Sequence, residues 1–405
     1  MAGTTTAPKK PIDADVETIT VNFGPQHPAT HGTLRIELDL DGERIVGARP
    51  EIGYLHTGFE KIAEEMSYNQ FVTVTDRMNY FSPLCNNFGF VHAVEEMCGI
   101  EITPRCKYAR VLLCELSRVA DHILSVGLGA MDLGAFSVML WGFVERERLY
   151  DIFEHATGAR LTTSHARVGG IARDIPDDLI PRIKKFIDDF PATLDKTEKM
   201  LSRNRIWWGR TVGVGALTTE QCLSYGVTGP LARASGVDYD LRRDRPYWAY
   251  PELDFNVITR TDGDIYARYK VRLDEMRESI KLIRQCLEKM PKGPINIEDH
   301  KVTIPSKKDV YTKMESLIMH FKHYMDDHGM DTPRRSEVYS CTESPNGELG
   351  WYIISQGRSQ PYRVRCRPPC LLTYGAYPEM IKNALISDAV AALSSINVIA
   401  GELDR

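Results

Sequence analysis

Apolar residues recur at helical spacing along most of this chain. The clearest case is 267–290, where apolar side chains return every three or four residues and so share one stripe of a helix. Pro291 and Gly293 end this helix. Similar patterns predict further helices over 55–70, 86–98, 104–126, 134–157, 176–203, 311–325 and 378–394.

Strict alternation of apolar and polar residues appears near both ends of the chain. Over 33–48 it predicts a β-hairpin that turns at Asp41 and Gly42, and the segment 17–23 adds a strand to it. Near the C-terminus, a β-like stretch turns at Asn346 and Gly347 and is followed by an alternating strand over 362–367.

The order of these elements predicts an α+β fold, mainly a helical bundle with small N-terminal and C-terminal β elements. We expect a disordered tail over 1–16 and an N-terminal α/β domain with the hairpin over 17–70. The helical core should occupy 71–330, and a hairpin, a helix and a terminal segment should occupy 331–405.

Composition is typical of a globular protein and excludes some partners. The 405 residues are 43% hydrophobic and 26% charged, and the net charge of −5 gives no global signal for nucleic acid or an anionic membrane surface. The first ten residues lack the apolar region of a signal peptide. The segment 123–144 is long enough to span a bilayer, but its four glycines and the charges on both sides favour a buried core helix.

The nine cysteines indicate no metal or disulfide framework. Their number is odd and no two have C-x-x-C spacing, so neither paired disulfides nor an ordinary zinc or iron–sulfur site is predicted. Reduced thiols in a cytoplasmic protein are the expectation.

Two histidines lie in a proline-rich loop. His27 and His31 are four residues apart, but Pro25 and Pro28 exclude an ordinary helix and with it a helical metal-ligand pair. A rigid loop can hold an imidazole in one place, which suits proton donation near neutral pH. Turn chemistry without a function is the alternative.

Other polar residues interrupt apolar segments. A carboxylate such as Asp132 is costly to bury unless it is paired, so we expect a histidine or arginine partner from another segment. The run 75–83 breaks helical periodicity and places a charge, an amide, a phenol and a hydroxyl close together. The glycines of 166–170 indicate a tight turn before a helix rather than a phosphate loop.

Several long motifs together resemble one family. From about Thr20 to its last residue, the chain resembles the 49 kDa or D subunit of the respiratory NADH:quinone oxidoreductases (complex I). The motifs occur in that family's order and spacing: GPQHPATHGTLR (24–35), EIGYLHTGFEK (51–61), DRMNYFSPLCN (76–86), MDLGAF (131–136), MESLIMHFKHY (314–324) and GELDR (401–405).

That family is in turn similar to the large subunit of nickel–iron hydrogenases, which bind metal through two C-x-x-C pairs. The resemblance places the four thiolate positions on Asn79, Ser82, Ile399 and Glu402, with Arg405 at a histidine position. Soft thiolates are the ligands that would capture nickel and iron, so their absence implies that this chain binds neither. The old metal pocket would then accept a quinone headgroup.

The resemblance also implies roles for individual residues. His31 and Tyr80 would each donate a hydrogen bond to one quinone carbonyl, and Asp132 would pair with His31 and favour its charged form. Arg77 would lie near a 4Fe–4S cluster of a partner protein. The remaining residues that line the pocket would be His27, Asn79, Ser82, Ile399 and Glu402.

The resemblance implies a chain that binds no cofactor itself and takes quinone as substrate. The cluster must belong to a partner, because this chain has no cysteine quartet. Expected partners within the complex are the iron–sulfur B subunit, the C subunit and the membrane-arm H subunit, but no nucleic acid. The expected location is peripheral, on the cytoplasmic side of the bacterial inner membrane.

This chain departs from the family at three places. Leu161, Thr162 and Thr163 stand where members often carry histidine, Thr57 stands where many have arginine, and Asn397-Val398 replaces an aspartate-led pair. The alternatives left open are a complex driven by ferredoxin or another donor, a scaffold without chemistry, and a true hydrogenase.

Overall fold

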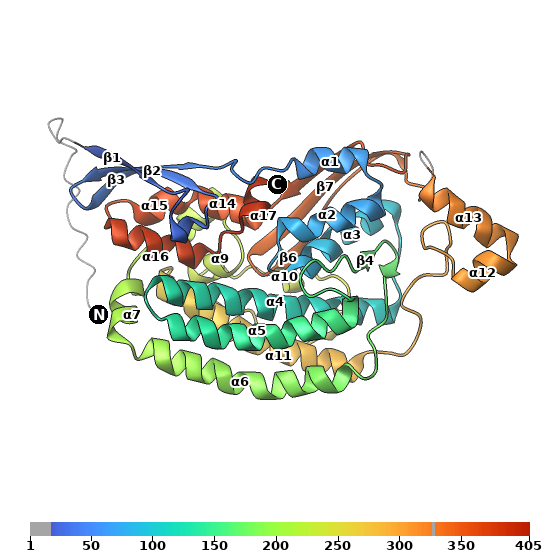
Figure 1. Cartoon of the computed structure of the whole chain (residues 1–405), viewed down its shortest axis with the longest axis horizontal. Coiled ribbons are helices and arrows are strands. Elements are labelled where there is room, and N and C mark those ends of the chain that lie inside the picture. The colour runs from blue at the N-terminus through green and yellow to red at the C-terminus, as the bar shows by residue number, and fades with distance from the viewer. Residues whose placement is uncertain (1–17, 326–328) are drawn as a thin grey trace.

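Four long helices form the main layer of the molecule. The structure, a computed structural model, describes residues 18–325 and 329–405. Helices α4 (Pro104–Asp132), α5 (Phe136–Thr157), α6 (Ile180–Ser202) and α11 (Ile265–Lys289) run side by side in a bundle (Figure 1). The hydroxyl of Thr103 accepts the backbone N–H of Cys106 and caps α4, and Pro104 fits the first helical turn.

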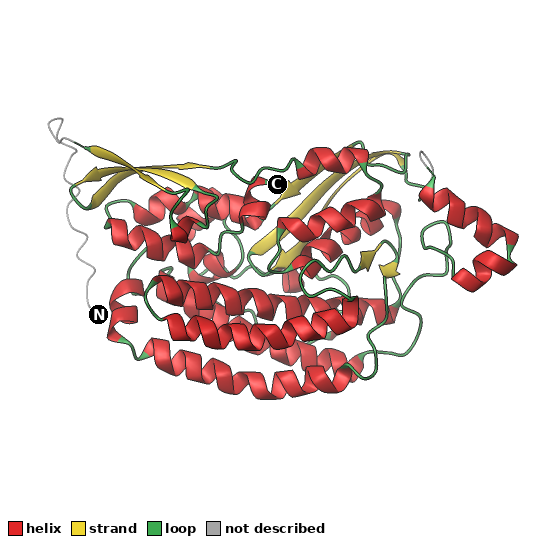
Figure 2. Ribbon diagram, in the orientation of Figure 1, coloured by secondary structure: helices red, strands yellow, loops and turns green. Residues whose placement is uncertain are grey.

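Two three-stranded antiparallel sheets lie on the other side of the molecule (Figure 2). The N-terminal sheet contains β1 (Ile19–Phe23), β2 (Arg35–Asp41) and β3 (Arg44–Glu51), and the C-terminal sheet contains β6 (Arg334–Ser344), β7 (Gly347–Gln356) and β8 (Arg363–Arg367). Both predicted β regions are therefore confirmed. Apolar residues of β2 point inward at every second position, as the alternation predicted.

Short helices and turns complete the chain. They are η1 (Pro28–Thr30), α1 (Phe59–Glu65), α2 (Tyr68–Met78), α3 (Pro83–Cys98), β4 (Ala166–Arg167), β5 (Gly170–Ile171), α7 (Arg205–Thr211), α8 (Thr219–Tyr225), α9 (Pro230–Ala234), α10 (Leu241–Asp244), η2 (Tyr250–Glu252), α12 (Lys307–Thr312), α13 (Met314–Tyr324), α14 (Pro369–Gly375), α15 (Tyr377–Ile381), α16 (Ile386–Ile396) and α17 (Ala400–Asp404). The α+β class with a helical bundle is confirmed. The predicted tail 1–16 lies outside the described residues, and the domain boundaries at 70 and 330 stay predictions.

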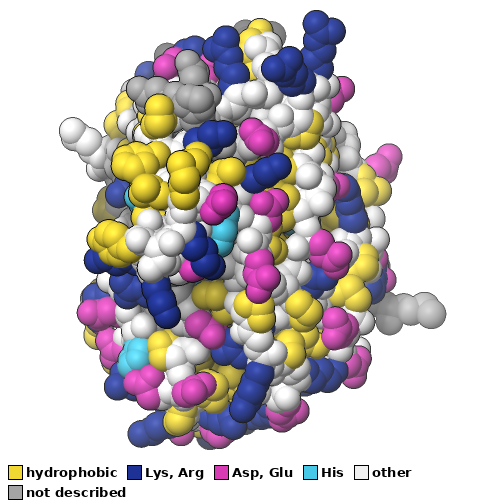
Figure 3. All heavy atoms as spheres, turned by 90° about the vertical axis from the view of Figure 1, so that its right-hand side faces the viewer, with side chains coloured by type: hydrophobic (Ala, Val, Ile, Leu, Met, Phe, Trp, Pro, Cys, Tyr) yellow, Lys and Arg dark blue, Asp and Glu magenta, His cyan; other side chains and the backbone are white. Residues whose placement is uncertain are grey.

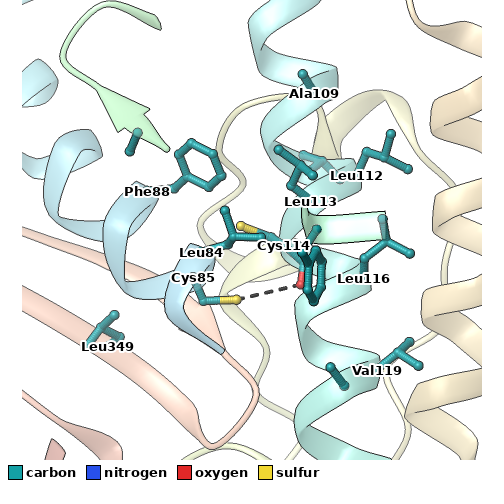
Figure 4. Close-up of a cluster of buried hydrophobic side chains, with 14 of the residues drawn as sticks. Leu84, Cys85, Phe88, Ala109, Leu112, Leu113, Cys114, Leu116, Val119 and Leu349 are labelled. Carbon is teal, nitrogen blue, oxygen red and sulfur yellow. Dashed lines mark hydrogen bonds between the residues drawn. The ribbon is translucent and has the colours of Figure 1, made fainter. Parts of the chain in front are cut away.

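The largest core cluster joins helices α3 and α4 to the C-terminal sheet. Leu84 and Phe88 of α3 face Leu113 of α4, and Leu349 of β7 lies behind α3 (Figure 4). The thiol of Cys85 donates to the carbonyl oxygen of Cys114 at 3.7 Å. All of these residues are buried, so the loop between α2 and α3 rests on a fixed support.

Three predicted helices are each divided in two, so their predicted extents were wrong. The range 55–70 contains α1 and α2, because Met66 is extended and Ser67 begins a new helix with a capping box. The range 311–325 spans the end of α12 and α13, which meet at the extended Lys313. The range 378–394 contains α15 and α16, separated by Asn383 in the left-handed region.

The apolar segment 123–144 is not one helix. It crosses from α4 to α5, and the turn between them contains Gly134 at a φ of 91°, which an L side chain rarely adopts. Within the described ranges, no helix combines the length and the hydropathy needed to cross a bilayer. The glycines of 166–170 form the hairpin of β4 and β5 rather than a turn before a helix.

Helices α12 and α13 extend from one end of the molecule and carry exposed apolar side chains (Figure 1). Tyr311, Met314, Phe321 and Tyr324 are each more than half exposed. Figure 3 looks at this end and shows hydrophobic side chains gathered among charged ones. Clusters of this kind are typical of surfaces that contact other proteins.

Candidate functional site

The loop between α2 and α3 is held by the buried side chain of Asn79. Its Oδ1 accepts the backbone N–H groups of Phe81 at 3.2 Å and Ser82 at 3.1 Å. Its Nδ2 donates to Oε2 of Glu402 at 2.9 Å, although the two residues are 323 positions apart. The structure therefore brings together two of the residues that the hydrogenase comparison placed in one pocket.

The C-terminal helix α17 is held by the segment before α1 on one side and by the end of α2 on the other. The carboxylate of Asp404 accepts the backbone N–H groups of Gly53 at 2.9 Å and Leu55 at 2.7 Å. A Cβ at Gly401 would lie 2.6 Å from the carbonyl oxygen of Arg77, so only glycine fits this close approach. Ile399, just before α17, is fully buried. The contacts of the GELDR motif therefore fix the position of α17, which carries Glu402.

Glu402 is a fully buried acid at the centre of this region. Burial, followed by the negative charge of Asp121, raises the pKa of Glu402 to about 8. Cys370 of α14 lies beside it, and burial raises the pKa of that thiol well above its usual range. At neutral pH, Glu402 is therefore mainly protonated.

Asp121 of α4 is the residue that the sequence analysis missed. It is fully buried, and its Oδ1 accepts Nδ2 of Asn397 at 2.6 Å. Asn397 also donates to Oδ1 of Asn346 at 2.7 Å. An aspartate at 397 would place a second carboxylate against Asp121, so the amide is complementary here. Burial raises the pKa of Asp121 above its ordinary range.

Tyr80 is half-buried in the loop that Asn79 shapes. Burial raises the pKa of Tyr80, and the ionised forms of Cys370 and Asp121 would raise it further. The phenol therefore keeps its proton at neutral pH and acts as a hydrogen-bond donor. Its ring packs edge-on against Phe81 with centroids 4.5 Å apart, and the guanidinium of Arg146 lies 5.4 Å from the Phe81 ring.

His31 and Asp132 line one cavity between the N-terminal loop and α4. The cavity also contacts Ser125, Ser394 and Asn397. His31 is exposed and ends the short helix η1 at a φ of 54°. Ser394 donates its hydroxyl to Asp132, and no ion pair joins His31 to Asp132 within 4.0 Å in the part of the chain that the structure describes. The direct pairing of these two residues stays a prediction.

Asn397 connects this cavity to the buried acids. It lines the cavity and also donates to Asp121, which lies beside Tyr80 and Glu402. The residues expected to contact the two ends of a quinone therefore belong to adjoining regions.

The remaining predicted residues, His27, Ser82 and Arg77, do not line the cavity of His31. His27 is exposed, and its Nδ1 accepts the backbone N–H of Ala29 at 3.2 Å. The hydroxyl of Ser82 is fully buried near Asp121. Arg77 is exposed at the end of α2 and donates to the carbonyl oxygen of Thr73, so its guanidinium is available at the surface.

Two family departures have different structural settings. Thr162, which stands in place of a family histidine, is half-buried, and the hydroxyl of the neighbouring buried Thr163 lies 3.5 Å from Oδ1 of Asn87. Thr57 is exposed in the loop before α1. None of these residues contacts Tyr80 or Glu402 through a hydrogen bond within the described residues.

The raised pKa of Glu402 predicts how stability depends on pH. The folded protein favours the protonated form, since the ordinary pKa of 4.5 rises to about 8. Its stabilising contribution, a few kcal/mol, is complete below about pH 4.5 and is lost as the pH rises to about 8. Glu402→Gln should flatten the fall of the melting temperature over this range. Glu220→Gln, on the exposed face of α8, is the control, and parallel curves for both variants would contradict the prediction.

Comparisons with known proteins identify the family of this chain. The family model described as respiratory-chain NADH dehydrogenase, 49 Kd subunit, matches residues 132–405. The chain is 44% identical to the D subunit of the NADH-quinone oxidoreductase of Geotalea uraniireducens, over 97% of this chain and 100% of the relative. It is 49% identical to the D 2 subunit of the enzyme of the same name from Cytophaga hutchinsonii, over 95% of this chain and 98% of the relative.

A third relative, the D 1 subunit of the NADH-quinone oxidoreductase of Chloroherpeton thalassium, is 47% identical over 96% of this chain and 88% of its own length. The class is therefore that of an oxidoreductase subunit built on a helical α+β fold. The chain belongs to the family of the respiratory-chain NADH dehydrogenase 49 kDa subunit, and the resemblance seen in its motifs is confirmed.

Proposed function

We propose that this chain is the quinone-site subunit of a proton-translocating NADH:quinone oxidoreductase. The relatives are named as D subunits of NADH-quinone oxidoreductases and match the chain over nearly its whole length. The observation that carries the proposal is the convergence of Tyr80, Asn79 and Glu402 beside Asp121, next to the cavity of His31.

In this proposal the phenol of Tyr80 and the imidazole of His31 donate hydrogen bonds to the two carbonyl oxygens of the quinone. The high pKa of Tyr80 supports this role, because a protonated phenol can donate to a carbonyl and to the more basic oxygen of the reduced ring. Ile399 lines the pocket as an apolar wall, which suits an uncharged ring. His27 borders the pocket from the N-terminal loop.

Asp132 provides the link to proton translocation in this proposal. When His31 gives up its proton, the carboxylate of Asp132 in the same cavity loses a positive neighbour. Loss of that charge changes the electrostatic energy of the half-buried carboxylate. The membrane arm would respond to that change.

Electrons come from a 4Fe–4S cluster held by a partner, the iron–sulfur B subunit. Arg77, exposed at the end of α2, would lie near that cluster. The C subunit and the membrane-arm H subunit are the other proposed partners. The exposed apolar residues of α12 and α13 support assembly with other subunits, because such surfaces are usually covered. The proposed location is peripheral, on the cytoplasmic side of the bacterial inner membrane.

A photoreactive quinone analogue tests the proposal on the assembled complex. We expect crosslinks to map to the loop 79–82, to His31 or to the segment 397–402, and excess unmodified quinone should suppress them. Label confined to other surfaces would contradict the quinone site. It would favour a scaffold in which partner subunits do all the chemistry.

A further inference from the structure

Three buried oxygen atoms near Tyr80 lack hydrogen-bond partners among the described residues. They are Oε1 of Glu402, Oδ2 of Asp121 and Oγ of Ser82. All three side chains are completely buried. Leaving a buried polar atom without a partner costs about 1–3 kcal/mol, and more for a charged group, so this arrangement is unfavourable unless it has a role.

Ionising both carboxyl groups at once is costly, so the pair gives up its proton only to a stronger base such as a phenolate. Glu402 and Asp121 come from distant parts of the chain, on α17 and α4, and the charge of Asp121 acts directly on Glu402. Two buried carboxylates that interact in this way hold one proton between them, because the second negative charge would be uncompensated. Asn79 on Glu402 and Asn397 on Asp121 each donate one hydrogen bond and supply no charge.

The charged and ionisable side chains around the two carboxyl groups indicate that the proton is on Glu402. Positive charge near Asp121 comes from Arg146 on α5 and Arg272 on α11. Glu402 instead adjoins the thiols of Cys370 on α14 and Cys366 on β8. Asp121 is therefore the group that ionises, and Glu402 is the group that holds the proton.

His122, the neighbour of Asp121 in the chain, belongs to a buried network of hydrogen bonds and ion pairs. Its Nε2 lies 2.8 Å from Oε2 of Glu275, whose Oε1 accepts Nε of Arg233 at 2.9 Å. These side chains are buried, and they connect α4 to the ionic network of α9 and α11. Asp121 is thus held between a fixed charged network and the quinone site.

We propose that Glu402 stores one proton for the quinone site and that Asp121 relays it to Tyr80. The proposal rests on the proposed quinone site. After Tyr80 gives its proton to an oxygen of the reduced quinone, the O–H bond of Glu402 breaks and a bond to Oδ2 of Asp121 forms. That bond then breaks and the phenol O–H of Tyr80 forms again. Glu402 has lost one proton, the quinone has gained one, and the electrons come from the iron–sulfur donor of the partner.

The direction of this transfer agrees with the acidities of the two ends. Glu402 has a pKa of about 8, whereas burial raises the pKa of Tyr80 above its ordinary value of 10.0. A proton therefore moves downhill from the carboxylic acid to the phenolate. Because Oδ1 of Asp121 already accepts a hydrogen bond from Asn397, Oδ2 is the oxygen that would receive the proton.

Infrared spectroscopy of the assembled complex tests the stored proton without turnover. In wild-type protein, a carboxylic acid C=O band should disappear as the pH rises through about 8. Glu402→Gln should remove this band, and Glu220→Gln should keep it. Asp121→Asn should shift the titration to lower pH, because the neighbouring negative charge is gone. A band that titrates alike in wild type and Glu402→Gln would overturn the proposal.

The pH profile of quinone reduction tests the relay. The wild-type rate should fall as the pH rises through about 8, whereas Glu402→Gln should be about tenfold slower and independent of pH in this range. If Glu402→Gln does not assemble, Asp121→Asn decides, since it should slow the reaction and move the profile. Unchanged rates in Asp121→Asn would overturn the relay.

The two proposals fail in distinguishable ways. If the quinone site is wrong, photolabel misses the loop 79–82 but the carboxyl band still titrates. If the stored proton is wrong, the photolabel maps as expected and the band does not depend on Glu402.

Discussion

Replacing Tyr80 by phenylalanine should lower quinone reduction by about a hundredfold or more, which is the contribution of a positioned proton donor. The ring stays, and its edge-on packing against Phe81 is retained. Only the phenol oxygen beside Asp121 and Cys370 is lost. The measurement is the rate of quinone reduction by the assembled complex, with electrons supplied from NADH.

Electron entry should be unaffected by this change. Reduction of an artificial acceptor that takes electrons before the quinone site should proceed at the wild-type rate in Tyr80→Phe. Tyr225→Phe, on the partly exposed end of α8, is the matched control. Normal quinone reduction in Tyr80→Phe would instead support the scaffold alternative.

The sequence pattern correctly predicted those helices and strands in which buried residues recur at one regular spacing. Helix α11 was predicted within two residues at each end, because its apolar stripe is continuous and Asp264 and Pro291 bound it. The hairpin of β2 and β3 was predicted by alternation and by the turn at Gly42. The residues that predict these elements lie within them or next to their ends.

The divided helices show where local patterns were insufficient. Between α1 and α2, the apolar spacing continues across Met66, and only the capping box of Ser67 and Gln70 marks the new start. Between α4 and α5, the apolar run hides a turn at Gly134. In both cases tertiary packing continues on the same face while the backbone changes direction.

Only those site residues that lie in motifs shared with the family could be predicted from the sequence. The hydrogenase comparison placed Asn79 and Glu402 in one pocket, because it aligned two distant motifs with one metal site, and the structure joins the two residues by a hydrogen bond. Asp121 was missed because it lies within an apolar helix and its partner Asn397 is 276 positions away. A buried carboxylate becomes recognisable as functional only when the groups facing it are known.

Replacing Asp132 by asparagine should slow quinone reduction. It should also lower the number of protons translocated per electron. The substitution preserves the size of the side chain and an oxygen that can accept the hydroxyl of Ser394, but it removes the negative charge from the cavity of His31. A loss of about 1.4 kcal/mol, well within the strength of a close charge pair near a protein surface, is a tenfold slower reaction. We expect about this loss in quinone reduction.

Membrane vesicles that contain the complex allow both effects of Asp132 to be measured together. The quinone-reduction rate and the quenching of a pH-sensitive dye give the protons translocated per electron, and this ratio should fall in Asp132→Asn. Asp132→Glu keeps the charge and should recover part of the ratio, whereas a loss of packing alone would affect both variants. If Asp132→Asn translocates protons and reduces quinone at wild-type rates, the charge of Asp132 has no part in coupling. The hydrogen bond from the hydroxyl of Ser394 would then be the structural role of this half-buried carboxylate.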